Sequence, residues 1–214
     1  MITKCLKYLF WLVLMKPLVT IIIGLNVRNR ERLPKDGPCI IVANHNSHLD
    51  TAVLVSLFPL KLLSKMRSVA AAEYFMKPKL LKWFATKIIG IIPIERGKAG
   101  TGFDPFTEVS ASLNRSEIVI IFPEGTRGEA EQLQTLKRGI SFLAKQHPQV
   151  PIVPIFLYGL GKSLPKDEAL LVPFFCDVFV GEAFTWTGDG TSFMQHLQDS
   201  FTELAAELPQ SRWL

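Results

Sequence analysis

His45 and Asp50 form the first group of residues whose types and spacing suit chemistry. The histidine follows the apolar run 38–43 (PCIIVA) in the segment NHNSHLD, and the aspartate comes five positions after it. A carboxylate in the first turn of the next helix can accept a hydrogen bond from one imidazole nitrogen, which leaves the other nitrogen to take a proton. Since the sequence contains no GxSxG elbow, we expect this base to act on a substrate hydroxyl.

Two further groups of polar residues also follow apolar runs directly. They are Glu95 and Arg96 after 91–94 (IIPI), and Glu124, Thr126 and Arg127 after 117–122 (EIVIIF). The forked donors of arginine match the oxygens of a phosphate group. Ligands of open α/β sheets collect outside the carboxyl ends of the strands. We therefore expect the three groups to converge on one cleft that binds a phosphorylated substrate.

Short apolar runs alternate with longer helical patterns from residue 38 onward. The predicted strands are 38–43, 67–72, 91–94, 117–122, 151–157 and 171–180, and the predicted helices are 49–57, 78–88, 103–114, 136–147 and 191–207. This alternation is typical of βα units, and strands so uniformly apolar are buried on both faces. Asp104 followed by Pro105 predicts a capped helix start. The sequence thus predicts an α/β fold with a mostly parallel central sheet flanked by helices.

The N-terminal 30 residues have a different character. Residues 5–25 (CLKYLFWLVLMKPLVTIIIGL) are almost wholly apolar, with basic residues on both sides. A spanning helix needs about 20 uninterrupted apolar residues, but Lys16 and Pro17 divide this run. We expect two short helices or one kinked helix embedded in a single leaflet, with a true span or burial in the core as alternatives. This divides the chain into a membrane-associated helical segment, residues 1–30, and a second domain, residues 31–214.

Composition and charge narrow the choice of partner. The chain has 214 residues, 48% of them hydrophobic, which suffices for one core and excludes bulk disorder. Residues 1–98 carry 16 Lys and Arg against 5 Asp and Glu (+11), whereas residues 99–214 carry 8 against 14 (−6). The basic half favours an anionic partner, and its apolar N-terminus favours a phospholipid membrane over nucleic acid. Three scattered cysteines form no disulfide framework, which suits the cytoplasmic face of a membrane, the inner membrane in a bacterium.

Four ordered blocks of the sequence resemble the glycerolipid acyltransferase family, in particular the lysophosphatidic acid acyltransferases. They are NHNSHLD (44–50), GIIPIER (90–96), FPEGTR (122–127) and VPIVPI (150–155). The resemblance implies an acyltransferase domain that moves a fatty acyl group from acyl-CoA or acyl carrier protein to the free hydroxyl of a lysophospholipid. The default acceptor is 1-acyl-sn-glycerol 3-phosphate and the product phosphatidic acid. The resemblance implies no cofactor and no metal.

The same resemblance assigns roles to individual residues. His45 and Asp50 become the catalytic dyad. The residues assigned to substrate binding are Asn44, Arg96, Glu124, Gly125, Thr126 and Arg127. For the mechanism we expect backbone amides at the helix start, 46–50, to stabilise the oxyanion. Ala71 and Ala72 stand where phosphatidate-forming members often carry Lys, so the acceptor is less firmly assigned than the reaction.

Other functions remain open to these residues. His45, His48 and Asp50 have the chemistry of metal ligands, although the remaining histidines, His147 and His196, follow no predicted strand. An acyltransferase acting on another lysophospholipid or polar lipid fits the same motifs. A non-catalytic module that binds anionic lipid explains the charge and the apolar N-terminus, but it gives no reason for the spacing of His45 and Asp50.

Overall fold

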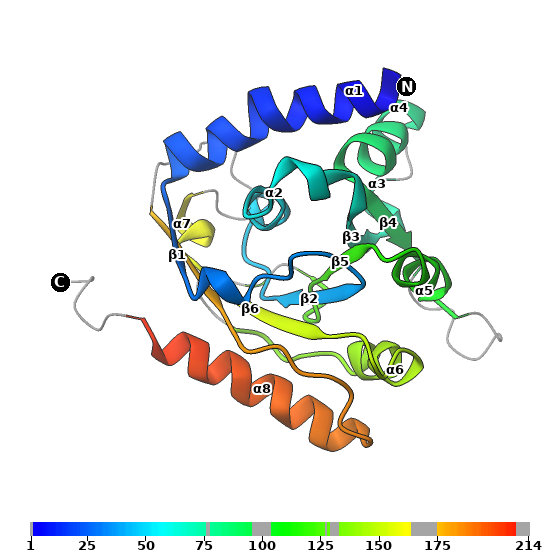
Figure 1. The fold of residues 1–214 in the computed structure, drawn as a ribbon, viewed down its shortest axis with the longest axis vertical. Coiled ribbons are helices and arrows are strands. Elements are labelled where there is room, and N and C mark those ends of the chain that lie inside the picture. Colours follow the sequence, from blue (N-terminus) through cyan, green and yellow to red (C-terminus); the bar gives the residue numbers. More distant parts are fainter. Residues whose placement is uncertain are drawn as a thin grey trace.

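A computed structural model describes residues 2–75, 78–95, 104–126, 128, 133–163 and 175–208. Its strands form one seven-stranded sheet in the order β1-β7-β6-β2-β5-β3-β4, with helices on both faces (Figure 1). The strands are β1 (Leu25–Arg28), β2 (Cys39–Ala43), β3 (Met66–Ala71), β4 (Ile91–Ile94), β5 (Ile118–Ile121), β6 (Ile152–Tyr158) and β7 (Cys176–Val180). Neighbouring strands pair in parallel except β6 and β7, which are antiparallel. The predicted α/β fold with a mostly parallel sheet is therefore confirmed.

Five of the predicted strands are present with small shifts at their ends, and β7 forms the second half of the strand predicted at 171–180, of which residues 171–174 lie outside the described residues. β2, β5 and β7 are buried along their whole length, and β6 is buried up to its last residue, in keeping with their unbroken apolar runs. β1 was not predicted. It is a four-residue edge strand that pairs with β7, and such a short strand shows no periodicity that sequence can reveal.

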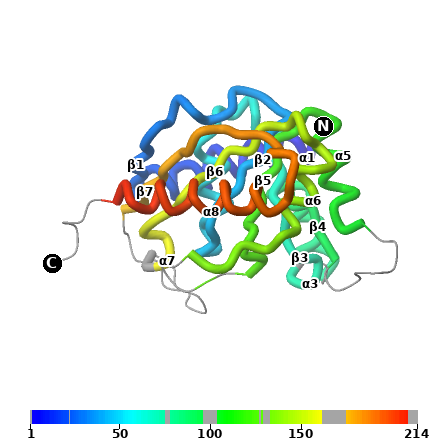
Figure 2. Tube along the Cα trace, turned by 90° about the horizontal axis from the view of Figure 1, so that it is seen from below, coloured from blue at the N-terminus to red at the C-terminus, as the bar shows by residue number. Residues whose placement is uncertain are grey.

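The helices cover the two faces of the sheet. They are α1 (Ile2–Leu9), η1 (Phe10–Met15), η2 (Leu18–Ile23), η3 (Arg30–Arg32), α2 (Asp50–Ser56), η4 (Leu60–Lys65), α3 (Ala72–Phe75), α4 (Lys79–Trp83), η5 (Phe84–Ile89), α5 (Thr107–Asn114), α6 (Gly139–Gln146), α7 (Leu160–Ser163) and α8 (Gly190–Ala206). The N-terminal helical run and α2 lie on one face (Figure 1), while α6 and α8 lie on the other (Figure 2). Helices from the two ends of the chain therefore cover opposite faces of the sheet.

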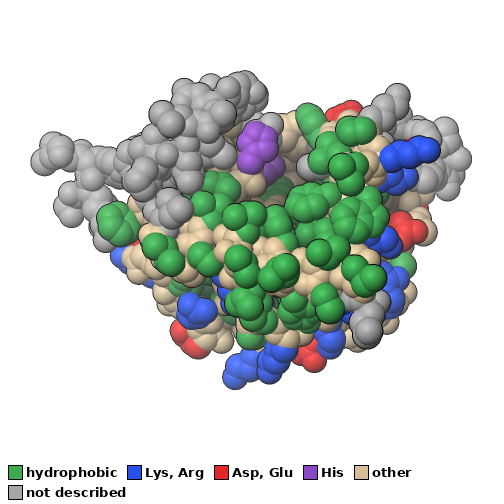
Figure 3. Space-filling view, turned by 90° about the horizontal axis from the view of Figure 1, so that it is seen from above, with side chains coloured by type: hydrophobic (Ala, Val, Ile, Leu, Met, Phe, Trp, Pro, Cys, Tyr) green, Lys and Arg blue, Asp and Glu red, His purple; other side chains and the backbone are tan. Residues whose placement is uncertain are grey.

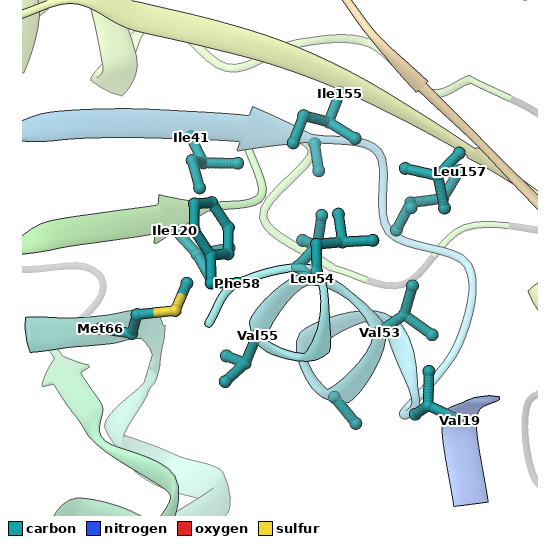
Figure 4. Close-up of a cluster of buried hydrophobic side chains, with 14 of the residues drawn as sticks. Val19, Ile41, Val53, Leu54, Val55, Phe58, Met66, Ile120, Ile155 and Leu157 are labelled. Atoms are coloured by element: carbon teal, nitrogen blue, oxygen red, sulfur yellow. The ribbon is translucent and has the colours of Figure 1, made fainter. Parts of the chain in front are cut away.

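A hydrophobic core lies on each side of the sheet. Because successive side chains of a strand point to opposite faces, Ile41 of β2 belongs to the core beneath α2, whereas Ile40 and Val42 belong to the core beneath α8. In the first core, Val53 of α2 lies beside Val19 of the N-terminal run (Figure 4). The N-terminal run therefore helps to fix the helix that begins at Asp50.

One helix start differs clearly from its prediction. α5 begins at Thr107 rather than at Pro105. The carboxylate of Asp104 instead accepts a hydrogen bond from the backbone N–H of Phe106 at 2.8 Å, within a turn that precedes the helix. At α8, in contrast, Asp189 caps the helix by accepting from the backbone N–H groups of Thr191 and Ser192.

The N-terminal run has one buried side and one exposed side. Trp11, Val19 and Ile23 are buried in the core, whereas Leu9 and Ile21 are exposed. Helical backbone continues through residues 16 and 17, with φ values of −62° and −59°. Within the described residues, no helix combines the length and the apolar character that crossing a bilayer requires.

Candidate active site

Two loops meet at the carboxyl ends of the paired parallel strands β2 and β5. The loop after β2 carries His45, and the loop after β5 carries Glu124, 79 positions later. The backbone N–H of His45 donates to Glu124 Oε1 at 3.4 Å, and the backbone N–H of Gly128 donates to the carbonyl oxygen of His45 at 2.9 Å. The structure thus brings His45 of the first polar group next to Glu124 of the third.

His45 and Asp50 are in direct contact. His45 Nδ1 lies 2.7 Å from Asp50 Oδ2, and the same oxygen accepts from the backbone N–H groups of Asn46 at 2.7 Å and Ser47 at 2.9 Å. Asp50 is completely buried as the first residue of α2, whereas the His45 side chain is 22% exposed. An ionised Asp50 accepts from a protonated Nδ1, so Nε2 is left to accept a proton from a substrate.

Four of the five backbone amides expected to stabilise an oxyanion have partners within the loop. Those of Asn46 and Ser47 donate to Asp50, that of Leu49 donates to Ser47 Oγ at 3.2 Å, and that of Asp50 donates to the Ser47 carbonyl at 3.3 Å. Four of the five amides in 46–50 are thus used within the loop itself, two of them to hold the Asp50 carboxylate. These contacts do not test whether this stretch stabilises an oxyanion, which stays a prediction.

Phe122 is a site residue that sequence reasoning missed. Its ring stacks on the imidazole of His45, with ring centroids 4.2 Å apart and ring planes at 19°. Phe122 is partly buried against the core beneath α2. Its position at the end of an apolar strand gives no sequence signal that separates it from a core residue.

Glu124 lies behind the histidine and is almost fully buried. Burial raises the pKa of its carboxyl group to about 7, assisted by the nearby charge of Asp50 and opposed by hydrogen bonds from the backbone N–H groups of His45 and Gln134. Its second oxygen, Oε2, is buried without a hydrogen-bond partner among the described residues. Glu124 therefore links the two loops, which is a positioning contact.

Asn44 joins β2 to β6. Its Nδ2 donates to the carbonyl of Leu157 at 2.9 Å, and its Oδ1 accepts from the backbone N–H of Leu157 at 2.7 Å. The side chain is fully buried. These two bonds hold the loop after β2 against β6, and the assignment of Asn44 to substrate binding stays a prediction.

The remaining predicted residues divide into two groups. Gly125 and Thr126 lie in the turn after β5, and Gly125 has a φ of +75°, which favours glycine. A side chain at Gly125 would place its Cβ 2.7 Å from Nζ of Lys137, so this turn lies beside a lysine that the sequence did not single out. Arg96 and Arg127 lie outside the residues that the structure describes.

The ends of β3 and β4 border a cavity of about 240 Å³ at the same edge of the sheet. It is lined by Ala71, Ala72, Glu73, Ile94 and Glu95. Ala71 and Ala72, the positions at which lysine is expected in phosphatidate-forming members, thus line this cavity. Elsewhere in the described residues, no three His, Cys, Asp or Glu side chains are grouped as metal ligands.

Comparisons with known proteins place this site in a family. The sequence profile of the Acyltransferase family matches residues 24–158. A chloroplastic 1-acyl-sn-glycerol-3-phosphate acyltransferase of Brassica napus is 31% identical over 144 residues, which are 67% of this chain and 40% of that protein. The human 1-acyl-sn-glycerol-3-phosphate acyltransferase alpha is 31% identical over 161 residues, 74% of this chain and 54% of that protein. The chain thus spans about half, or less, of the length of these relatives.

A solved structure shares the fold. The crystal structure of the 1-acyl-sn-glycerophosphate acyltransferase PlsC from Thermotoga maritima superimposes with a TM-score of 0.75 at 20% sequence identity, covering 100% of this chain and 81% of that one. The region matched by the family profile holds β1 to β6 together with His45, Asp50 and the loop after β5. The chain belongs to the Acyltransferase family.

Proposed function

We propose that this protein transfers a fatty acyl group from an acyl thioester to the free hydroxyl of a lysophospholipid. The observation that carries the proposal is the 2.7 Å contact between His45 and a fully buried Asp50, in a loop within the family match. The proposed acceptor is 1-acyl-sn-glycerol 3-phosphate and the product phosphatidic acid, in line with the names of the relatives. Acyl-CoA or acyl carrier protein supplies the acyl group.

In the proposed mechanism His45 is the general base. Its Nε2 takes the proton of the acceptor hydroxyl while the hydroxyl oxygen attacks the thioester carbonyl carbon. The hydrogen bond from Nδ1 to Asp50 stabilises the imidazolium that forms. The tetrahedral intermediate then expels the donor thiolate, which takes the proton from Nε2 and leaves as the thiol. No acyl-enzyme forms, and the histidine returns to its starting state.

The acceptor phosphate is proposed to lie over the turn after β5. Gly125 and Thr126 border this position, and Arg96 and Arg127 supply the guanidinium groups. Lys137, whose Nζ lies beside Gly125, adds a further cation. Bringing several cations to one dianionic phosphate is favourable because the opposed charges are close and partly shielded from water.

The N-terminal segment, predicted as residues 1–30 beside an acyltransferase domain of residues 31–214, is proposed to lie with its helical run against one leaflet at the cytoplasmic face of a membrane, while β1 (Leu25–Arg28) belongs to the central sheet. The support is the one-sided exposure of its helical run, where Leu9, Val13 and Ile21 are exposed and Trp11 is buried. A lysolipid acceptor resides in the same leaflet, while thioester donors arrive from the aqueous side.

An acceptor panel tests the proposed function. The purified full chain in detergent is given a radiolabelled acyl group, carried either by CoA or by acyl carrier protein. The acceptors are lysophosphatidic acid, lysophosphatidylethanolamine and lysophosphatidylcholine, and each reaction is run with and without a chelator. We expect label in phosphatidic acid at a rate above that of the other products and unaffected by chelation. A larger rate with another acceptor would reassign the substrate, and no transfer from either donor to any acceptor would favour the lipid-binding module.

A further inference from the structure

The helix α4 presents apolar side chains to solvent, although it lies far from the N-terminal segment in the sequence. None of its residues is buried. Leu80 is 75% exposed, and Leu81 and Trp83 are also exposed. Tyr74 on the preceding helix α3 is 58% exposed. Exposed apolar side chains concentrated on one short helix indicate a surface that another apolar phase covers.

The exposed side of α4 continues the exposed side of the N-terminal helical run. α4 leads directly into η5, and η5 packs against η1: Trp11 Nε1 donates to the Ile88 carbonyl at 3.2 Å, and the rings of Phe10 and Phe84 meet edge to face at 5.2 Å. Hydrophobic side chains gather across this face of the molecule, with Lys and Arg side chains near its rim (Figure 3). The two helical segments therefore form one apolar face.

Positive charge accompanies the apolar side chains. Lys79 and Lys82 on α4 and Lys87 on η5 are all exposed. Lysines beside a membrane surface are attracted to anionic lipid, and Trp and Tyr prefer the level of the headgroups. A second copy of this chain would suit the surface less well, because isologous contact would bring like charges together.

We propose that Tyr74, Leu80, Leu81 and Trp83, with Lys79, Lys82 and Lys87, form a second docking surface for an anionic phospholipid bilayer. This α4 surface acts together with the N-terminal segment, and the inference rests on the proposed function in taking the bilayer as the source of the acceptor. Together they widen the apolar face that meets the membrane, and a wider face fixes the tilt of the molecule, which a single helix lying in a leaflet does not.

Docking of the α4 surface would affect how a lysolipid reaches His45. α2 begins at Asp50 and packs on the N-terminal run through Val53 and Val19 (Figure 4), so the loop with His45 lies next to the helices that contact the bilayer. With α4 also docked, this loop is held near the headgroups. A lysolipid then reaches His45 by lateral movement, without leaving the membrane.

Vesicle binding of the full chain tests the α4 surface without any turnover. Cosedimentation is measured with vesicles of equal parts phosphatidylglycerol and phosphatidylcholine and with pure phosphatidylcholine. The variant with Leu80→Ser and Trp83→Ser is expected to bind both kinds of vesicle at least about tenfold more weakly. Lys79→Ala and Lys82→Ala are expected to weaken binding about fivefold each on the anionic vesicles alone.

A matched control comes from the other side of the sheet. Phe142 on α6 is 63% exposed, and Phe142→Ser is expected to bind vesicles like the wild type. Thermal unfolding midpoints of all variants should agree with that of the wild type, which shows that they fold. Wild-type binding by the α4 variants would overturn the inference, as would α4 variants that turn a dimer in solution into a monomer. Since the assay involves no acyl transfer, its result is separate from that of the acceptor panel.

Discussion

The imidazole of His45 is stacked on the ring of Phe122, with the ring centroids 4.2 Å apart. Asp50 holds Nδ1 of the same imidazole, and the backbone of His45 is bound on both sides by Glu124 and Gly128. The loop after β5 therefore positions the base that the loop after β2 supplies. We therefore expect catalysis to depend on residues outside the dyad, and Phe122 is the first of these residues to test.

Replacing Phe122 by leucine removes the stack and keeps an apolar side chain. The imidazole then has more freedom about its bonds, and misplacement of a catalytic group by about 1 Å costs up to about 100-fold in rate. We expect Phe122→Leu to lower kcat by about 10- to 100-fold with little change in KM for either substrate. Phe122→Tyr, which keeps the ring, should retain most of kcat. A lower unfolding midpoint with normal kcat in Phe122→Leu would reduce Phe122 to a packing residue.

Glu124 makes the stability of the protein depend on pH. Burial raises the pKa of its carboxyl group from 4.5 to about 7. Between these values the folded chain keeps a proton that the unfolded chain has released, so the free energy of unfolding falls as the pH rises. The Glu124→Gln variant lacks this loss. Its free energy of unfolding should therefore match that of the wild type at pH 4.5 and exceed it by about 3 kcal/mol above pH 7.

Urea unfolding at several pH values measures this difference. Glu108, exposed on α5, provides the control, because Glu108→Gln should differ from the wild type by a nearly constant amount across the same range. A Glu124→Gln variant whose difference from the wild type did not change with pH would show that folding does not raise the pKa of Glu124.

Lys7 makes the stability of the protein depend on pH in the alkaline range. Only 6% of this residue is exposed, and its pKa is lowered from 10.5 to about 8 by burial and by the charge of Arg67, against the attraction of Glu117. Between pH 8 and 10.5 the unfolded chain binds a proton that the folded chain lacks, so stability rises with pH. Lys7→Met should therefore be more stable than the wild type by about 3 kcal/mol at pH 7 and by little at pH 10.5.

The same unfolding experiment checks Lys7, with Lys4→Met as its partner. Lys4 is exposed on the same helix, so its replacement should leave the pH profile unchanged. If Lys7→Met destabilised the protein at pH 7, the ammonium group would be a favourable contact of α1 and the account of its burial would be wrong.

Lys137 is expected to contribute to acceptor binding. Its Nζ lies beside Gly125, in the turn over which the acceptor phosphate is proposed to lie. Lys137→Ala should raise KM for lysophosphatidic acid about 5- to 50-fold, the loss of one charge-assisted hydrogen bond, with KM for the acyl donor unchanged. Lys145→Ala, an exposed lysine on α6, is the control. Equal rises in KM for donor and acceptor would place Lys137 elsewhere in the site.

The sequence predicted more of the fold than of the site's internal contacts. Long apolar runs such as 117–122 predict a buried strand whatever surrounds them. β1 has only four residues, and it forms a strand because it pairs with β7. The spacing of His45 and Asp50 is local to one loop and the start of one helix, so their contact could be anticipated. The stacking of Phe122, the bridge from Asn44 to Leu157 and the approach of Lys137 depend on the three-dimensional arrangement of distant segments.

The hydrogen bonds of the amides at 46–50 could not be predicted from the sequence. Amides at a helix start are usually free to bind an anion, and here the anion is part of the protein. The Asp50 carboxylate takes the N–H groups of Asn46 and Ser47, because a buried carboxylate needs hydrogen-bond donors. Sequence spacing reveals which groups are near one another, but it does not reveal how many donors one carboxylate uses.

The role of His45 as general base is the central claim, and one kinetic comparison tests it most directly. Acyl transfer from acyl-CoA to lysophosphatidic acid is measured for the wild type and His45→Ala, together with equilibrium binding of lysophosphatidic acid to each. The account predicts a fall in kcat of about 10²- to 10⁴-fold with acceptor affinity nearly unchanged. Wild-type kcat in a folded His45→Ala protein would contradict it.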